Sequence, residues 1–507
     1  MRRLAVIVAV LAGLALAVPP APADAESAPR WVGITARDGV RLGANVVEPS
    51  TPGPHPGIVF ISSWGANDTE YLAQATVLAR RGYVVLSYAP RGFGGSGGHV
   101  EVAGPADVTD VTDALDWMVA HTSVDPDRIG VGGISYGAGI GLIASGHDPR
   151  IRAVLAMSGW TDLVESLYSG QTRRLQTVGF LGGVAALAGR PSPELQQVLA
   201  DYFANRDIAG VTAWARVRGA AAYVDRINAH APAIFLANAY GDSIFGPNQL
   251  VDFYGRLTGP KRLELAPGDH GMVEATGLAG LPNHVWAGAH RWLDRYVAGA
   301  STPIPDAVVL RSRTTPSVLE TYGDWGDVSG RSVTYALNGP GALTTRTVPV
   351  GWERTITSGV PTTADAGVVM LSNGLEALTG VPPLVSLPTV SRLHAGVWTT
   401  DRLAEPAAIR GAAHLRLTAR QRGGGTVVAY LYDVDALGTG RLVGHAPVTW
   451  RTDGPLDVRF PATSYDVPAG HRVALVVDTV DPLYLDAGPL GAPLVFGGRS
   501  TLDLPLR

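Results

Sequence analysis

Three residues have the types and the chain order that nucleophilic catalysis needs: a serine at 135, an aspartate at 242 and a histidine at 270. Ser135 lies in the stretch Gly-Ile-Ser-Tyr-Gly at 133–137, which has the form of a nucleophile elbow. A serine hydroxyl attacks a carbonyl carbon only when a base takes its proton. These residues therefore predict acyl transfer to water, with Ser135 as nucleophile, His270 as general base and Asp242 as the acid that orients the histidine.

A second stretch of the same form, Gly-Gly-Ser-Gly-Gly, lies at 94–98, and the chain holds 63 glycines. Context separates the two, because an elbow must follow a strand directly and open a helix. Residues 128–132 form a strand pattern before Ser135, and residues 138–144 form a helical pattern after it. Ser96 lies in a glycine-rich loop with no helical pattern after it, so we favour Ser135.

The acid and the base each follow a short apolar run, at 233–236 and 262–265, as the later members of such a triad should. Asp269 is the rival acid, but a residue adjacent to His270 would have difficulty reaching its ring. Asp242 is therefore the preferred partner of the histidine.

Negative charge that develops on the attacked carbonyl oxygen needs two hydrogen-bond donors. The backbone amide of Tyr136, directly after the nucleophile, is the first. We expect the second from the loop at 62–65, where Trp64 offers its backbone amide or its indole N–H. The other interpretation of Trp64 is a large apolar wall of the pocket.

The elements that would hold these residues alternate between strand and helix over residues 31–300, which predicts the α/β class with a largely parallel sheet covered on both faces. A hairpin is expected at Asp38-Gly39 between 32–34 and 40–47. Further strands are expected at 57–61, 84–88, 129–131, 153–157, 233–236 and 262–265, and helices at 70–81, 108–120 and 285–297.

The alternation breaks between residues 160 and 229, where the sequence is helix-like and rich in Ala, Gly and Arg. We expect a helical cap over the active site there; a longer pair of surface crossover helices is the alternative. Beyond residue 306 short Val, Thr, Leu and Tyr runs alternate with Gly, Pro and Asp, without a long helical period. Strands at 415–417, 427–432, 456–460 and 473–477 predict an all-β sandwich over 306–507, after an α/β-hydrolase domain over 26–305.

The first 25 residues have the layout of a cleavable secretory signal: Arg2 and Arg3, an apolar run over 4–18, and Ala-Asp-Ala at 23–25. Cleavage after Ala25 would give a secreted, extracellular protein without membrane attachment. An uncleaved anchor is the alternative, although the apolar run is short for one.

The amino-acid composition limits the kinds of molecule that the protein is expected to bind. The formal net charge is -4 and only 17% of residues are charged, so the chain lacks the basic footprint of a protein that binds nucleic acid or an anionic membrane. The absence of cysteine excludes disulfides, thiolate metal sites and a cysteine nucleophile. No cofactor or metal is implied, because Asp433 and Asp435 lack the spacing of a calcium loop. The expected partner is a small-molecule ester or peptide substrate.

Several motifs together resemble the X-Pro dipeptidyl-peptidase and cocaine-esterase family of α/β-hydrolase serine hydrolases. They are Asp-Gly-Val-Arg-Leu at 38–42, Arg-Gly-Phe-Gly-Gly-Ser-Gly-Gly at 91–98, the elbow at 133–137, Gly-Asp-His-Gly at 268–271, and the stretches 429–434 and 469–475. The resemblance implies a catalytic α/β domain with an inserted helical cap, and a jelly-roll (galactose-binding-like) domain that helps to shape the pocket. This sequence departs from many relatives where it has Trp64, because they place a tyrosine hydroxyl in that loop.

Three functions follow. The first is an esterase-like serine hydrolase that cleaves an ester or amide through an acyl-enzyme. The second is an X-Pro dipeptidyl-peptidase, which must also bind an N-terminal ammonium. Asp162 and Glu165 are candidates, although solvated charges on a helix are the favoured interpretation of both. The third is a polymer- or carbohydrate-binding surface protein with vestigial catalysis. The lack of an extra N-terminal domain favours the shorter, esterase-like members.

Overall fold

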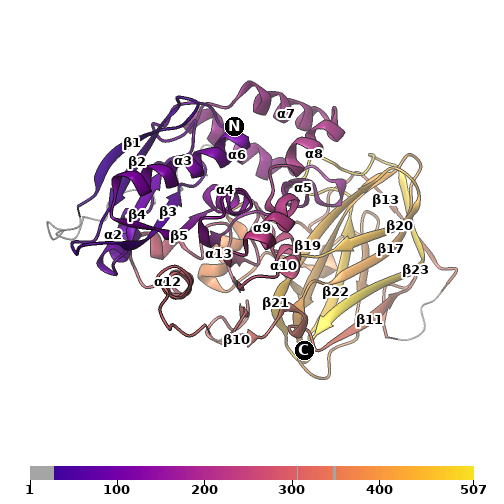
Figure 1. Ribbon diagram of the computed structural model, residues 1–507. Helices are drawn as coiled ribbons and strands as arrows, with labels where there is room; N and C mark the ends of the chain where they lie inside the picture. The colour runs from indigo at the N-terminus through magenta and orange to yellow at the C-terminus, as the bar shows by residue number, and fades with distance from the viewer. Residues whose placement is uncertain (1–27, 305, 346–349) are drawn as a thin grey trace.

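The structure, a computed structural model, describes residues 28–304, 306–345 and 350–507. A ten-stranded sheet flanked by helices forms one part of the molecule, and two antiparallel sheets form the other (Figure 1). The α/β fold with an inserted helical cap and a C-terminal all-β domain is therefore confirmed. The expected signal at 1–25 lies outside the described residues. In those that are described, no helix is both long and apolar enough to cross a membrane.

The large sheet has the strand order β1-β2-β4-β3-β5-β6-β7-β8-β9-β10. The strands from β3 to β9 pair in parallel, whereas β1, β2 and β10 join the edges antiparallel. The strands are β1 (Arg30–Thr35), β2 (Arg41–Val47), β3 (His55–Ile61), β4 (Val84–Tyr88), β5 (Val124–Ile134), β6 (Ile151–Met157), β7 (Ala233–Ala239), β8 (Lys261–Ala266), β9 (Val308–Arg311) and β10 (Leu319–Tyr322).

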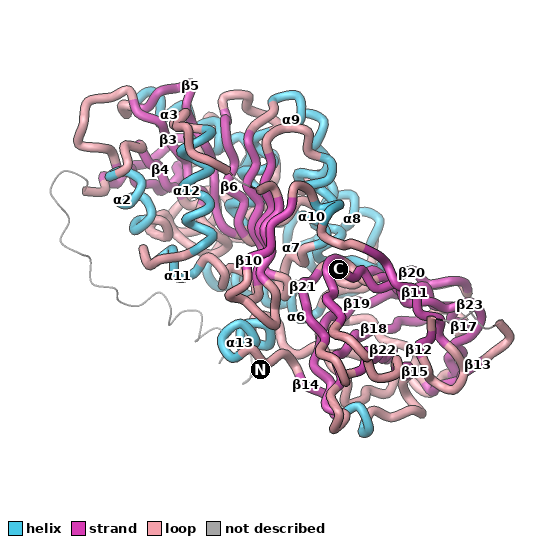
Figure 2. The backbone as a smooth tube through the Cα atoms, turned by 90° about the horizontal axis from the view of Figure 1, so that it is seen from below, coloured by secondary structure: helices cyan, strands magenta, loops and turns pink. Residues whose placement is uncertain are grey.

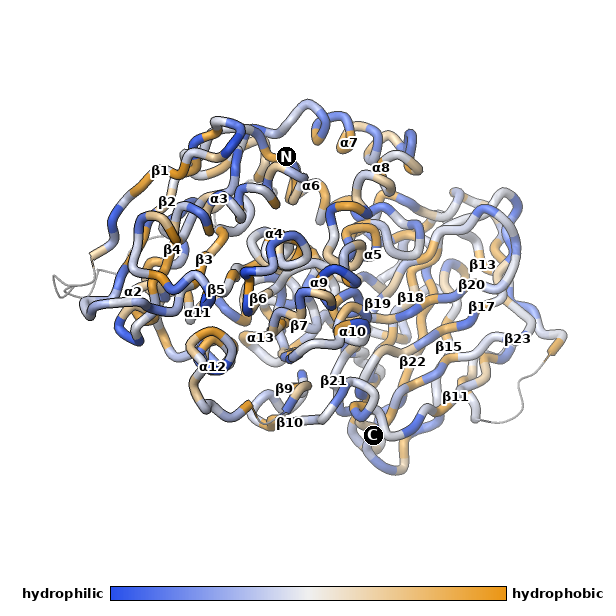
Figure 3. The backbone as a smooth tube through the Cα atoms, in the orientation of Figure 1, coloured by the Kyte–Doolittle hydropathy of each residue, from blue (hydrophilic) through white to orange (hydrophobic). Residues whose placement is uncertain are grey.

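Helices cover both faces of this sheet, so the residues of its central strands are buried and mostly apolar. In Figure 3 much of these strands is orange, the colour of hydrophobic residues. On β3, Val59 and Ile61 belong to the apolar core that also contains α3, α4 and α10, whereas Ile58 and Phe60 belong to the core that contains α2 and α12. The helices are α2 (Leu72–Arg80), α3 (Pro105–His121), α4 (Tyr136–Ser145), α10 (Asn248–Arg256), α11 (Ala275–Leu278) and α12 (His284–Tyr296). The helix expected from residue 108 starts three residues earlier, because Pro105 suits the first helical position.

The segment between β6 and β7 forms the helices that we call the cap. They are α5 (Leu163–Tyr168), α6 (Leu175–Ala188), α7 (Pro193–Ala204), α8 (Ile208–Arg216) and α9 (Val224–His230). In Figure 1, α5 and α8 lie between the large sheet and the β domain. Arg173, just before α6, forms a 2.6 Å ion pair with Asp486 of the β domain. The cap is thus attached to both parts of the molecule.

The β domain packs two sheets face to face around a shared apolar core (Figure 2). One sheet contains β14, β19, β18, β22 and β15, and the other is built around β23. The strands are β11 (Arg331–Leu337), β12 (Leu343–Thr344), β13 (Glu353–Thr357), β14 (Leu384–Ser386), β15 (Gly396–Thr399), β16 (Ala407–Gly411), β17 (His414–Arg420), β18 (Gly425–Val434), β19 (Thr439–Trp450), β20 (Gly454–Arg459), β21 (Thr463–Val467), β22 (Arg472–Asp478) and β23 (Pro493–Leu506).

Two features differ from the sequence-based picture of the region beyond residue 306. Strands β9 and β10 extend the large sheet to Tyr322, since Val308 pairs with Leu263 of β8. A helix, α13 (Ser372–Thr379), lies between β13 and β14. Asn373 of this helix donates a 2.6 Å hydrogen bond to the carbonyl oxygen of Gly241, so contact with the large domain holds the helix in place.

Candidate active site

Ser135 lies on the sharp turn between β5 and α4. Its φ of 56° and ψ of -110° are strained for a residue with a side chain. Gly133 and Gly137 make the turn possible, because a Cβ on either would lie 2.6 Å and 1.9 Å, respectively, from the carbonyl oxygen of Ile61. The two glycines of the motif are therefore required for close packing on β3, and the serine is presented at the end of its strand.

Ser135, His270 and Asp242 form a continuous hydrogen-bonded chain. The distance from Ser135 Oγ to His270 Nε2 is 2.7 Å, and that from His270 Nδ1 to Asp242 Oδ2 is 2.9 Å. The other oxygen of Asp242 accepts hydrogen bonds from the backbone amides of Ile244, at 2.9 Å, and Phe245, at 2.7 Å. Because these bonds fix the carboxylate, the geometry leaves Asp242 Oδ2 directed at the ring and His270 Nε2 directed at the hydroxyl.

The pKa of His270 results from opposing effects. Burial acts to lower it, but the charge of Asp242 and its hydrogen bond outweigh burial, so the pKa is raised above the ordinary value of 6.5. A histidine that accepts a proton must be neutral.

We expect kcat/KM to be lost as the pH falls through the raised pKa of His270, with a half-maximal value above pH 6.5. Rates for a p-nitrophenyl ester measured between pH 5 and 9 check this. Glu274→Gln is expected to move the midpoint to lower pH, because the charge of Glu274 contributes to the raised pKa. An acidic limb centred below pH 6 in the wild-type protein would contradict the assignment of His270.

The two rivals considered from the sequence have other contacts. Asp269 Oδ1 accepts hydrogen bonds from the amide and hydroxyl of Ser243, both at 2.8 Å, and from the amide of His270 at 2.7 Å, so it ties the acid and histidine loops together. Ser96 Oγ accepts from the amide of Gly43 at 2.9 Å and donates to the carbonyl of Ala89 at 2.7 Å. Ser96 is fully buried and stabilises a turn.

The structure shows which of the two N–H groups of Trp64 is available as an oxyanion donor. Its indole Nε1 donates to the carbonyl oxygen of Leu181, 3.0 Å away, so the indole is not free to serve as an oxyanion donor. Within the described part of the chain, the backbone amides of Trp64 and Tyr136 have no acceptor. Both residues line the pocket next to Ser135. The two amides thus remain as candidate donors, and the Trp64 side chain is a pocket wall.

Two carboxyls that sequence reasoning missed brace the site: Glu70, which is partly buried, and Glu274, which is fully buried. Glu70 accepts hydrogen bonds from the amide and hydroxyl of Ser63, at 2.7 Å and 2.6 Å, and so holds the loop before Trp64. Glu274 accepts from the Ser158 hydroxyl at 3.0 Å, and that hydroxyl accepts from the amide that follows His270 at 3.1 Å. Burial raises the pKa of each carboxyl to about 7. No motif marks either residue, since each works only through contacts across the fold.

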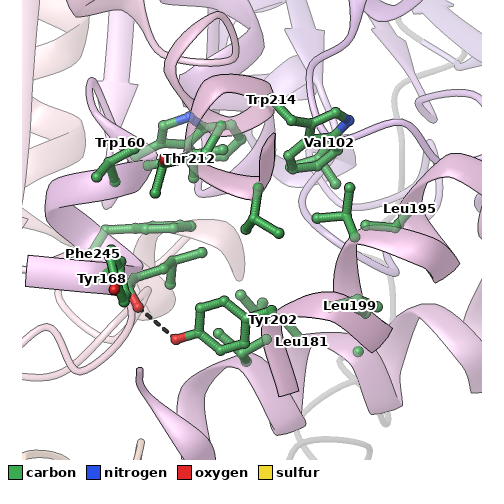
Figure 4. Close-up of a pocket in the computed structure, with 18 of the residues that line it drawn as sticks. Val102, Trp160, Tyr168, Leu181, Leu195, Leu199, Tyr202, Thr212, Trp214 and Phe245 are labelled. Carbon is green, nitrogen blue, oxygen red and sulfur yellow. Dashed lines mark hydrogen bonds between the residues drawn. The ribbon is translucent and has the colours of Figure 1, made fainter. Parts of the chain in front are cut away.

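Ser135 opens into a pocket roofed by the cap, which we call the cap pocket (Figure 4). Its empty space, including the part open to solvent, is about 950 Å³. Trp64, Tyr136 and Trp160 contribute aromatic surface, and cap residues such as Leu181 and Leu199 contribute aliphatic surface. None of the described residues that line it carries a charged side chain. Helix α6 is apolar around much of its circumference, which is a sequence signal for a helix that faces a cavity.

Comparisons with known proteins agree with this architecture. The sequence model of the X-Pro dipeptidyl-peptidase (S15 family) matches residues 38–272, and that of the X-Pro dipeptidyl-peptidase C-terminal non-catalytic domain matches residues 303–494. A solved α-amino acid ester hydrolase aligns over 97% of this chain and 98% of its own, with 18% identity and a TM-score of 0.73. A CocE/NonD family hydrolase from Staphylococcus aureus aligns over 94% and 93%, with 11% identity and a TM-score of 0.73.

Curated relatives match shorter stretches. An acyltransferase from Aspergillus calidoustus is 34% identical over 110 residues, which cover 21% of this chain and 36% of that protein. An uncharacterized protein from Pseudomonas aeruginosa is 29% identical over 184 residues, or 34% of this chain and half of that protein. The matched stretches thus span about a third to a half of these relatives.

The fold and the matched models define the class of this protein as a serine hydrolase of the α/β-hydrolase fold. Both parts of the chain match models of one family, and in that order. The chain belongs to the X-Pro dipeptidyl-peptidase (S15) family.

Proposed function

We propose that this protein hydrolyses esters through an acyl-enzyme formed on Ser135, with His270 as general base and Asp242 as the orienting acid. The observation that carries the proposal is the hydrogen-bonded chain from Ser135 Oγ through both ring nitrogens of His270 to Asp242, with distances of 2.7 Å and 2.9 Å. Few arrangements other than a nucleophile, base and acid use this geometry.

The reaction has two halves. Ser135 Oγ attacks the ester carbonyl carbon while its proton moves to His270 Nε2; the carbon–oxygen bond to the alcohol then breaks, and His270 returns the proton to the departing alkoxide. Water next attacks the acyl carbon and gives a proton to His270. The bond to Ser135 Oγ breaks, the acid leaves, and the serine regains its proton. The backbone amides of Tyr136 and Trp64 would stabilise the oxyanion in both halves.

The second candidate function is that of an X-Pro dipeptidyl-peptidase, the activity for which the matched family is named. That activity needs a counter-charge for the substrate's ammonium group. Asp162 instead caps α5, accepting hydrogen bonds from the amides of Val164 and Glu165 at 2.8 Å and 3.0 Å, and Glu165 is exposed at the surface. Neither residue lines the cap pocket. The surroundings of Ser135 therefore favour an esterase.

We expect kcat/KM for p-nitrophenyl butyrate to exceed that for Gly-Pro-p-nitroanilide by at least about 100-fold, because the cap pocket offers no partner for a charged amine. Initial rates of nitrophenol and nitroaniline release check this. Equal or better turnover of the anilide would replace the esterase assignment with the dipeptidyl-peptidase.

We also propose that the protein is exported. The first 25 residues support this, because two arginines precede an apolar run and a cleavage site of small residues. A small ester reaching the protein outside the cell is then its expected partner. Detection of the mature protein in culture medium with Glu26 as its first residue tests this proposal, and retention of the intact leader would refute it.

A further inference from the structure

We infer that the cap pocket binds an uncharged, apolar chain of the ester and discriminates against an ammonium group on that chain beside the scissile ester. This inference rests on the proposed esterase function, because it concerns the substrate of Ser135. Ser135 lines the pocket together with residues of α5, α6, α7 and α8. A chain attached to the reacting carbonyl would therefore enter it directly.

The polar atoms of the lining are largely engaged with the protein. The indole nitrogen of Trp160 donates to the carbonyl oxygen of Arg218, 2.6 Å away, as that of Trp64 does to Leu181. The hydroxyl of Tyr202 donates to the carbonyl of Leu167 at 2.7 Å, the bond that is dashed in Figure 4. The hydroxyl of Thr212 donates to the carbonyl of Ile208 at 2.9 Å. These residues thus offer mainly carbon to a ligand.

Two donors of the lining have no protein partner among the described residues: the hydroxyl of Tyr168 and the indole nitrogen of Trp214. Both groups tolerate a neutral chain, and neither offers a counter-charge to an ammonium group. A charged amine in the pocket would lose its hydration without an opposite charge to replace it, which is strongly unfavourable.

The shape of the pocket depends on a glycine of α6. Gly182 lines it, and a Cβ at this position would meet only Leu199 Cδ1, at 3.6 Å, an ordinary contact. A larger side chain at 182 therefore fits the backbone and occupies space in the pocket. The adjacent Gly183 does not line the pocket, is exposed, and would have no atom within 4 Å of its Cβ. The two glycines form a matched pair for substitution.

The first test compares esters in a pH-stat, below their solubility limits. Ethyl octanoate and octyl acetate are isomers that place the same chain on the acid or the alcohol side, and ethyl acetate lacks it. Each buried methylene is worth about a fourfold gain in kcat/KM. We expect at least one isomer to exceed ethyl acetate by about 50-fold or more, and the preferred isomer identifies the side that enters the pocket.

The second test adds charge at constant chain length. Ethyl 2-aminooctanoate carries an amine on the acid-side chain and 2-aminooctyl acetate carries one on the alcohol-side chain, so each places the charge on the chain that would enter the pocket; at pH 6 both amines are protonated. The derivative of the preferred isomer is expected to lose at least about tenfold in kcat/KM relative to its parent at the same pH. Equal or faster hydrolysis of the amino ester would overturn the inference.

The third test links the preference to the pocket. Gly182→Leu is expected to lower the ratio of kcat/KM for the preferred isomer to that for ethyl acetate by at least about tenfold, and Gly183→Leu to leave the ratio unchanged. Both substitutions favour a helix, so both variants should fold. An unchanged ratio in Gly182→Leu overturns the inference. The esterase function itself fails separately, if a fluorophosphonate does not label Ser135 and no ester is hydrolysed.

Discussion

Replacing Ser135 by alanine is expected to lower kcat/KM for p-nitrophenyl butyrate on the order of 10⁴- to 10⁶-fold. The substitution removes Ser135 Oγ, the hydroxyl oxygen at the end of the hydrogen-bonded chain, while the oxyanion amides and the pocket remain. Ester hydrolysis rates, with circular dichroism to verify folding, check the prediction. Activity within tenfold of wild type would refute Ser135 as nucleophile.

Ser96→Ala is the matched control, because it removes a serine hydroxyl from the other Gly-x-Ser-x-Gly stretch. The loss leaves the amide of Gly43 without its acceptor, so the free energy of unfolding should fall by about 1–3 kcal/mol. The folded fraction is expected to retain its activity. We therefore expect Ser96→Ala to be less stable but active, and Ser135→Ala to be stable but inactive. This result would assign a structural role to Ser96 and a catalytic role to Ser135.

Asp242→Asn is expected to lower kcat about 10⁴-fold, although it changes only one atom. The two backbone amides that bind Asp242 Oδ1 require an acceptor, so the asparagine would turn its oxygen to them and its NH₂ group to His270 Nδ1. The ring would then carry its proton on Nε2 and could not accept one from Ser135. Steady-state kinetics and the thermal midpoint check this.

Asp269→Asn is the matched control for Asp242→Asn, because it makes the same change in the neighbouring carboxylate. The oxygen of an asparagine at 269 can still accept the three hydrogen bonds that Asp269 Oδ1 accepts, and none of them comes from the imidazole ring. We expect a change in kcat within about tenfold. If Asp269→Asn were as damaging as Asp242→Asn, the assignment of the orienting acid would be wrong.

The parts of this architecture that depend on local periodicity are predictable from the sequence. The strand at 84–88 has the expected bounds, and the strand expected at 153–157 starts only two residues earlier. Such strands are apolar on both faces, and their flanking helices carry apolar stripes, so the pattern is strong. The positions of Ser135, Asp242 and His270 after strands could be inferred for the same reason.

Features that depend on distant contacts could not be predicted. The indole of Trp64 bonds to Leu181, 117 positions away, and no local pattern specifies that partner. Strands β9 and β10 look like sandwich strands in the sequence, because a short edge strand carries no information about which sheet it joins. No sequence motif marks Glu70 or Glu274, and they gain their roles only through the hydrogen bonds that the fold brings to them.

Mass spectrometry of the protein after treatment with a fluorophosphonate tests the central claim most directly. We predict a single adduct on the peptide that contains Ser135, formed in parallel with the loss of ester hydrolysis, and its absence in Ser135→Ala and His270→Ala. An adduct on another residue, or full esterase activity in a protein whose Ser135 is completely labelled, would contradict the account.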